Sequence, residues 1–123
     1  MRDWSIARGD IIKVDFGKPI GSVQGGIRPA LVIQNNIGNR FSPTTIVVSL
    51  TTQSKKEIAT HYKLSKDTYK FLTEDSIVLA EQIMTISEKQ IKKKIGSINQ
   101  KDLEKVNEKI LISVGLNNIF CFS

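Results

Sequence analysis

The sequence predicts a single α+β domain over residues 1–123, in which a small, strongly bent β-sheet or barrel precedes a final helix. Three observations support this fold class. The chain has 123 residues, 40% of them apolar, which suits one hydrophobic core. Short strand-like runs follow one another from Ile11 to Thr85. Beyond Thr85 the apolar residues recur mainly at helical spacing, which indicates that helix completes the domain.

The strand predictions depend on alternation and on β-branched runs. Ile12, Val14 and Phe16 alternate with Lys13 and Asp15, so one face of this segment is apolar. Further β-branched or apolar runs cover residues 30–34, 45–51, 62–64 and 76–80. Glycine and proline interrupt the pattern at residues 17–19, 25–26, 29 and 38–43, where we expect turns or open loops.

The last third of the chain carries helix signals. Ser87 and Gln90 have the spacing of a capping box, which predicts a short helical turn before one more strand at residues 92–98. Asn99 suits the start of a final helix and Gly115 suits its end. The apolar positions between them recur at intervals of three and four: Leu103, Val106, Ile110 and Val114. We expect the part of this face formed by Leu103, Val106 and Ile110 to contribute to a dimer interface.

The charge balance favours a polyanionic partner. Lys and Arg number 18 against 12 Asp and Glu, a formal net charge of +6, which makes nucleic acid a reasonable candidate. Charge that serves only solubility is an equal alternative. The charged first residues, the lack of an apolar run of membrane-spanning length and the single Cys121 favour a cytoplasmic protein over a secreted or membrane protein.

An arginine beside paired glycines is the strongest candidate for chemistry. Gly25 and Gly26 permit backbone conformations closed to other residues and let a ligand approach closely. Pro29 favours an extended backbone at Arg28, which would hold the guanidinium where a loop meets a strand. A guanidinium stays charged and matches a phosphate with two parallel hydrogen bonds, so this segment suits phosphate binding. The alternative is a hairpin loop with an exposed arginine.

Two further features allow more than one interpretation. Residues 46–54 form a predicted buried strand that ends in Thr51, Thr52, Gln53 and Ser54, whose side chains suit either phosphate and base contacts or an ordinary turn. His61 is the only histidine and lacks the clustered His, Cys or carboxylate ligands of a metal site, so we expect neither a metal nor another cofactor. His61 itself suits a structural role or acid–base chemistry.

The order and spacing of several segments resemble the MazF/PemK toxin family, in particular its Gram-positive MazF branch. The agreement runs from about Ala7 to Leu116 and therefore covers nearly the whole chain. The segments that carry it are Arg8-Gly9-Asp10, Gln24-Gly25-Gly26-Ile27-Arg28-Pro29, Ile33-Gln34-Asn35, residues 38–44, Thr51-Thr52-Gln53, residues 75–79, Glu81-Gln82-Ile83 and residues 112–116.

This resemblance implies an SH3-like barrel with appended helices, a homodimer, and a sequence-specific, metal-independent endoribonuclease of a type II toxin–antitoxin system. A MazE-like antitoxin would neutralise it, and the two proteins together would bind DNA. The family's catalytic arginine falls on Arg28 and its catalytic threonine on Thr51. By the same resemblance, single-stranded RNA would be contacted by Phe16, Ser22, Gln24, Gly25, Gly26, Gln53, Ile58, Thr60, His61, Glu81 and Gln82.

The resemblance also implies a reaction. A ribose 2′-hydroxyl attacks the adjacent phosphate, which gives a 2′,3′-cyclic phosphate and a free 5′-hydroxyl. Arg28 would stabilise the charge of the transition state and Thr51 would hold a phosphate oxygen. The general base stays open, with Arg28 in an unusual environment and His61 as the two candidates.

The chain departs from the family at two positions. Met84 stands where relatives usually carry an arginine, which changes the local charge, and Ala30 replaces a bulkier apolar residue. Two other functions remain open at this point: a gyrase-inhibiting toxin of the same fold, and a catalytically silent RNA-binding module. The presence of both Arg28 and Thr51 favours the ribonuclease, because neither alternative needs this pair.

Overall fold

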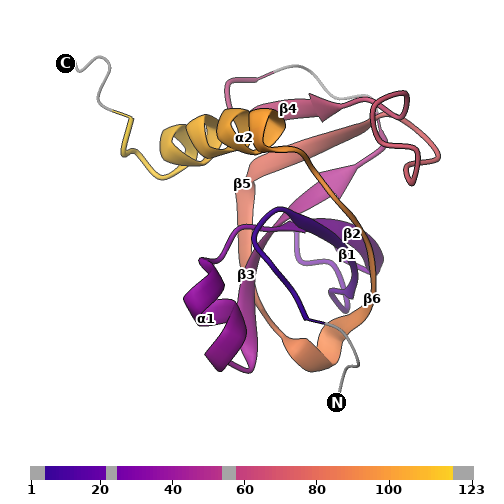
Figure 1. Ribbon diagram of the computed structural model, residues 1–123, viewed down its shortest axis with the longest axis vertical. Helices are drawn as coiled ribbons and strands as arrows, with labels where there is room; N and C mark the ends of the chain where they lie inside the picture. The colour runs from indigo at the N-terminus through magenta and orange to yellow at the C-terminus, as the bar shows by residue number, and fades with distance from the viewer. Residues whose placement is uncertain (1–4, 22–24, 54–57, 118–123) are drawn as a thin grey trace.

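The computed structural model describes residues 5–21, 25–53 and 58–117, which form one antiparallel sheet with two α-helices (Figure 1). The strands are β1 (Asp10–Asp15), β2 (Ile27–Val32), β3 (Thr44–Thr51), β4 (His61–Leu64), β5 (Ser76–Ser87) and β6 (Ile91–Ser97). The helices are α1 (Asn36–Phe41), the 3-10 turn η1 (Glu88–Gln90) and α2 (Gln100–Ser113). The α+β class predicted from the sequence is confirmed.

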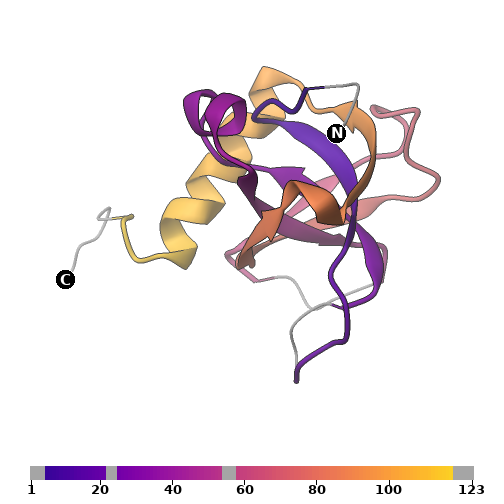
Figure 2. The ribbon, with the colours of Figure 1, turned by 90° about the horizontal axis from the view of Figure 1, so that it is seen from below.

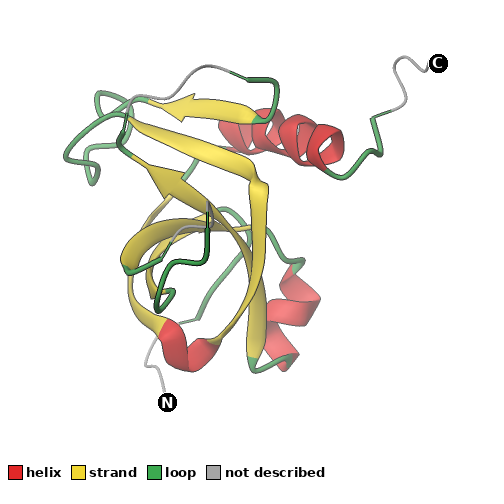
Figure 3. Ribbon diagram, turned by 180° about the vertical axis from the view of Figure 1, so that it is seen from behind, coloured by secondary structure: helices red, strands yellow, loops and turns green. Residues whose placement is uncertain are grey.

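The sheet is strongly curved, and its strand order is β4-β5-β3-β2-β1-β6. Every neighbouring pair runs antiparallel. Figure 3 shows the strands curling around one side of the molecule. Among the described residues the hydrogen-bonded ladders leave β4 and β6 at the two edges, so what they show is a strongly bent sheet.

A large bulge divides β5 where it passes β3. On β3, Val48 lies opposite Ile83, whereas the next residue, Ser49, lies opposite Leu79. Three residues of β5, numbers 80–82, therefore have no partner on β3. Bulges bend a strand and redirect its side chains, and they are frequent beside functional sites. The bend is visible in Figure 3. The bulge contains Glu81 and Gln82.

Two hydrophobic clusters occupy opposite faces of the sheet, because successive side chains of a strand point to opposite sides. The first lies under α2 and contains Ile11, Leu31, Val48, Leu50, Leu64, Tyr69, Val78, Ile98, Leu103 and Val106. The second lies on the other face and contains Ile6, Ile12, Val14, Phe16, Ala30, Val32, Val47, Ile86 and Ile91. The small Ala30 is fully buried in the second cluster.

The helix α2 uses its apolar face within its own domain. Leu103 and Val106 are buried in the first cluster, and Ile110 packs against it. The expectation that these three residues form a dimer face is therefore wrong: burying them on the sheet removes the same apolar area from water without a second chain. The C-terminal end of α2 projects past the sheet (Figure 2) and leaves Leu111 and Val114 exposed.

The predicted caps of the C-terminal helices are confirmed. Asn99 accepts a hydrogen bond from the backbone N–H of Asp102, at 2.8 Å, and so satisfies one free N–H of the first turn. Ser87 and Gln90 form the complete capping box of η1. Gly115 follows α2 with φ of 76°, a conformation that favours glycine. No helix in the described part of the chain is long and apolar enough to cross a membrane.

The helix α1 replaces the turn or loop expected at residues 38–43. Asn35 begins it by accepting a hydrogen bond from the backbone N–H of Gly38, at 2.8 Å. Asn39 is buried and links the helix to the sheet, because Thr45 Oγ1 donates to Asn39 Oδ1 at 2.6 Å. These contacts outweigh the low helix propensity of the segment. Pro29, also expected in a turn, lies within β2 opposite Lys13.

Arg8 and Asp10 serve the fold. Arg8 donates through Nε to the Ile33 carbonyl at 2.8 Å and through Nη2 to Asn107 of α2 at 2.6 Å. Asp10 is buried and accepts from Ser97 Oγ at 2.6 Å, and it pairs with Lys94 at 3.1 Å. Arg8 and Asp10 therefore connect the start of β1 to β6 and to α2.

Candidate active site

Arg28 lies on β2, at the entrance of the loop that joins β1 to β2. It is half-buried and faces Val14 of β1 in the ladder. Its Nε donates to the carbonyl of Gly25 at 2.7 Å. Within the described part of the chain neither Nη group has a partner. The guanidinium is thus held by one nitrogen and presents the other two, which suits a two-pronged contact with a phosphate.

Close backbone contacts fix the base of this loop. The N–H of Phe16 donates to the Gly26 carbonyl at 2.9 Å, and the N–H of Gly26 donates to the Gly17 carbonyl at 2.6 Å. Gly25 passes so close to Pro19 that a Cβ on Gly25 would lie 2.3 Å from the Pro19 nitrogen. Figure 2 shows the chain projecting away from the sheet beyond β1. Glycine is therefore required at the position whose carbonyl holds Arg28.

Thr51 is the last residue of β3 and is 2% exposed. Its Oγ1 accepts a hydrogen bond from the backbone N–H of Gln53 at 3.2 Å. A hydroxyl has one proton to donate as well as two lone pairs, so this contact leaves the O–H available. The Gln53 N–H fixes the oxygen, and among the described residues the hydroxyl proton has no assigned acceptor.

The strand register brings Arg28 and Thr51 to the same level of the sheet. The last paired residues of β2 and β3 are Ala30 and Ser49. Two residues further along each strand lie Arg28 and Thr51, and a step of two keeps side chains on the same face. That face carries the second hydrophobic cluster, which includes Ala30 and Val14. Extending the ladder by two residues on each strand therefore puts Arg28 and Thr51 on the same face, beyond the last paired residues and at one end of this cluster.

Thr60, His61 and Glu81 form a second polar group. Thr60 Oγ1 donates to Glu81 Oε1 at 2.8 Å, and His61 Nε2 lies 3.2 Å from Glu81 Oε2. Burial alone would raise the pKa of Glu81, but the backbone N–H of Glu81 and the contacts with Thr60 and His61 lower it below its usual value. Thr60 and His61 lie in one segment of the sequence and Glu81 in another. In the fold, the bulge of β5 brings Glu81 next to Thr60 and His61.

The ladder separates His61 from the Arg28 and Thr51 pair. His61 lies opposite Leu79, which lies opposite Ser49, so two strand spacings separate His61 from β3. Strands are about 4.8 Å apart, which makes this about 10 Å. A general base must come within hydrogen-bonding distance of its proton. The position of His61 disfavours that role for a hydroxyl bound at Thr51 and suits contact with a neighbouring nucleotide.

The other predicted RNA contacts have varied surroundings. Gln53 and Ile58 are exposed beside the end of β3 and the start of β4, and Gln82 is half-buried in the bulge. Phe16 is only 9% exposed and packs in the second cluster, so its ring lies in the core at the base of the loop between β1 and β2. Ser22 and Gln24 lie outside the described residues. These contacts stay predictions.

Sequence reasoning missed three residues beside Thr51. Lys63, Asp75 and Ile77 line a pocket of about 320 Å³ together with Thr52 and Gln53. Asp75 and Ile77 lie in a segment that carries the family resemblance, but only the ladder reveals that they lie near Lys63 and Thr51. Ser49 was missed too: its Oγ is buried without a partner among the described residues, on the face that carries Thr51.

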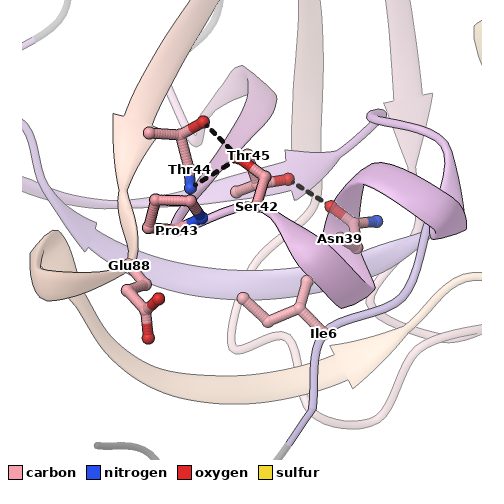
Figure 4. A pocket seen from close by; sticks show the side chains of 7 residues that line it. All are labelled: Ile6, Asn39, Ser42, Pro43, Thr44, Thr45 and Glu88. Carbon is pink, nitrogen blue, oxygen red and sulfur yellow. Dashed lines mark hydrogen bonds between the residues drawn. The ribbon is translucent and has the colours of Figure 1, made fainter.

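A second hollow near α1 is structural. It measures about 10 Å³, room for a single water molecule, and is lined by Ile6, Asn39, Ser42, Pro43, Thr44, Thr45 and Glu88 (Figure 4). Hydrogen bonds between its own lining residues, such as Ser42 with Thr44 at 2.9 Å, hold it together. It is too small for a nucleotide. In the described parts of the chain, no three His, Cys, Asp or Glu side chains gather as metal ligands would.

The fold and the candidate site define a small α+β domain in which an arginine and a threonine point to one sheet face, with chemistry that suits a phosphate. Residues 7–114 match the family model described as "PemK-like, MazF-like toxin of type II toxin-antitoxin system". The chain therefore belongs to this toxin family.

Individual relatives agree with this assignment. The Endoribonuclease MazF of Staphylococcus saprophyticus is 43% identical over 113 residues, which cover 91% of this chain and 93% of that protein. A mycobacterial endoribonuclease solved in complex with its cognate antitoxin has a TM-score of 0.76 at 25% identity, covering 91% of this chain and 97% of that one. MazF from Deinococcus radiodurans has a TM-score of 0.78 at 20% identity, with coverage of 92% and 99%, and shows the likeness of fold.

Proposed function

We propose that this chain is an endoribonuclease toxin that cleaves single-stranded RNA without a metal ion, with Arg28 and Thr51 as its catalytic residues. One observation supports the proposal: the register of β2 and β3, continued by two residues on each strand, puts the two side chains on one face. The guanidinium of Arg28 is anchored through Nε, and Thr51 keeps its O–H for donation. The pair thus offers charge and hydrogen bonds to a single phosphate. The relation to an endoribonuclease at 43% identity supports the same activity.

The chemistry needs only groups that RNA and this site provide. A bond forms between the ribose 2′-oxygen and phosphorus, and the bond from phosphorus to the 5′-oxygen breaks. The 2′-proton passes to a general base or to water, and the departing 5′-oxygen takes a proton from a general acid or from water. Negative charge grows on the non-bridging phosphate oxygens, and preorganised donors such as Arg28 and Thr51 stabilise it most at that stage. A guanidinium at this position also suits proton donation to the leaving oxygen.

The test of this function is cleavage of a long mixed RNA by the purified protein, with mapping of the cut sites. We expect cleavage to survive excess EDTA. A deoxyribose on the 5′ side of the cut should stop the reaction, because the attacking hydroxyl is then missing. The same substitution one nucleotide away is the control and should leave cleavage intact. A strict need for a divalent ion would overturn the mechanism.

We further infer a homodimer that a MazE-like antitoxin inhibits in the cytoplasm. The exposed apolar end of α2 supports a two-fold contact, since Leu111, Val114 and Leu116 are 44%, 48% and 68% exposed. The net charge of +6 supports an acidic, extended antitoxin segment that competes with RNA. The strong curvature of the sheet supports an SH3-like barrel as the description of the fold. DNA binding by the toxin–antitoxin complex belongs to the same proposal.

A further inference from the structure

The pocket beside Thr51 has a defined place in the fold. Thr52 and Gln53 line it from the end of β3, Lys63 from β4, and Asp75 and Ile77 from the start of β5. Its volume is about 320 Å³. Small-molecule sites begin at about 300 Å³, so the pocket suits a group of the size of a single base.

The ladder sets this pocket next to the proposed catalytic pair. Thr51 lies opposite Ile77, and Ile77 lies opposite Lys63. Neighbouring strands are about 4.8 Å apart. The pocket thus begins one strand from Thr51 and ends two strands away, on the side remote from Arg28. A nucleotide whose phosphate contacts Thr51 has its own base, or the next one, within reach of this pocket.

The pocket contains a cationic hydrogen-bond donor, Lys63, and an anionic acceptor, Asp75. The Lys63 ammonium lies 3.4 Å from Asp75 Oδ2, and the backbone N–H of Lys66 donates to Asp75 Oδ1 at 2.9 Å. The Lys66 N–H, followed by Lys63, holds the pKa of the Asp75 carboxyl below its usual value. Asp75 is therefore ionised at neutral pH and only accepts hydrogen bonds, whereas Lys63 only donates. Two carboxylate oxygens accept more bonds than these two neighbours use.

We propose that this pocket receives one unpaired base of the RNA beside the cleaved bond, and that Asp75 selects a base with an exocyclic amino group. The inference rests on the proposed ribonuclease function. Adenine, cytosine and guanine each carry an amino group near a ring acceptor, which matches Asp75 as acceptor and Lys63 as donor. Uracil presents two carbonyl acceptors and one ring N–H, so it fits the carboxylate less well. Ile77 supplies an apolar contact for the ring.

The variant Asp75→Asn tests this assignment with little change of structure. The amide oxygen still accepts the bond from the Lys66 N–H, so the turn is kept, while the NH₂ group replaces an acceptor by a donor. Asp67→Asn is the matched control, because Asp67 is exposed in the same loop and does not line the pocket. Lys63→Met removes the donor, with Lys70→Met as its control, because Lys70 is exposed and does not line the pocket. Cleavage rates are measured on oligonucleotides that vary each base around the mapped cut.

We expect the wild-type protein to prefer an amino-bearing base over uracil by about tenfold at one position near the cut. Asp75→Asn should abolish or reverse that preference, and Lys63→Met should weaken it, while both controls keep it. Three results overturn the inference: a wild-type preference for uracil at every position, an unchanged preference in Asp75→Asn, or an equal loss of rate on all substrates in that variant. In each case the wild-type protein still cleaves RNA. A wild-type protein that cuts no RNA overturns the proposed function as well.

Discussion

At the scale of single residues, the atoms that anchor Arg28 and Thr51 differ from the atoms proposed to contact RNA. The Gly25 carbonyl holds one nitrogen of Arg28, and the Gln53 N–H holds the oxygen of Thr51. Each functional group is fixed by a backbone atom and keeps its remaining hydrogen-bonding capacity. Backbone anchors do not change when a nearby side chain is replaced, so the effects of substitutions at Arg28 and Thr51 should reflect chemistry more than folding.

Replacing Arg28 by alanine should reduce RNA cleavage by about a thousandfold or more, because the main charge that stabilises the transition state is lost. Arg28→Lys should recover little of the activity, since an ammonium lacks the two-pronged geometry. Thermal unfolding should change little, because the side chain is only half-buried and makes one described hydrogen bond. Full activity of a folded Arg28→Ala protein would remove Arg28 from the mechanism.

Replacing Thr51 by alanine should have a smaller effect, about 2–4 kcal/mol of transition-state stabilisation, which is the usual cost of losing one such donor. Thr51→Ser keeps the hydroxyl and should stay near the wild-type rate. Thr51→Val keeps the shape and loses the hydroxyl, so it should resemble the alanine variant. Single-turnover cleavage of one oligonucleotide measures all three. Equal rates in the serine and valine variants would exclude a role for the hydroxyl.

At the scale of elements, a cluster of two tyrosines and one aspartate fastens α2 to the sheet. Tyr62 of β4 donates to Asp102 Oδ1 at 2.5 Å, and Tyr69 donates to Asp102 Oδ2. The backbone N–H of Asn99 in turn donates to the Tyr69 oxygen at 3.1 Å. Burial, together with Asp102, raises the pKa of each tyrosine to about 12. The cluster joins the start of α2 to the strand that carries His61 and Lys63.

These raised pKa values predict a loss of stability in alkali. A tyrosine in the unfolded chain ionises near pH 10, whereas in the folded protein it ionises near pH 12. The unfolded state therefore loses protons first, and the free energy of unfolding should fall as the pH rises from about 10 to 12. The double variant Tyr62→Phe, Tyr69→Phe should be less stable at pH 7 by about 2 kcal/mol, with a shallower fall above pH 10. Denaturant titrations at each pH measure the difference, and identical slopes would contradict it.

The sequence predicted elements whose signals are local and missed those that depend on distant partners. Asn99, Ser87 and Gly115 mark helix ends through neighbours in the chain, so α2 and η1 were predictable. The helix α1 depends on the hydrogen bond between Asn39 and Thr45 of β3, and the burial of that pair against the sheet leaves no signal in the local sequence pattern. Arg28 was predicted from the glycines and the proline beside it, whereas its pairing with Thr51 as catalytic residues came from a family resemblance. Their alignment, and the pocket at Asp75, follow from the β2, β3, β4 and β5 ladders, whose register a single sequence does not determine.

At the scale of the whole molecule, the projecting end of α2 predicts how subunits associate. Light scattering at micromolar concentration should give the mass of a dimer. Leu111→Glu combined with Val114→Glu should give a folded monomer, because both side chains are exposed in the single chain and carry little of its stability. Lys101→Glu, on the solvent face of the same helix, is the control and should stay dimeric. A wild-type protein with the mass of one chain would contradict the dimer.

The long strand β5 has a consequence for the evolution of such proteins. Its first residues border the pocket at Ile77, its bulge carries Glu81, and its end is anchored in the core by Ile86. Arg28 and Thr51 lie on other strands. Ser76, Val78 and Leu79 at its start are buried, so only the outward positions Asp75 and Ile77 can change there while the fold and the strands of Arg28 and Thr51 stay as they are. Under the proposed base selection, a lineage built on this plan can acquire new RNA targets through changes at these two positions, without passing through an inactive ancestor.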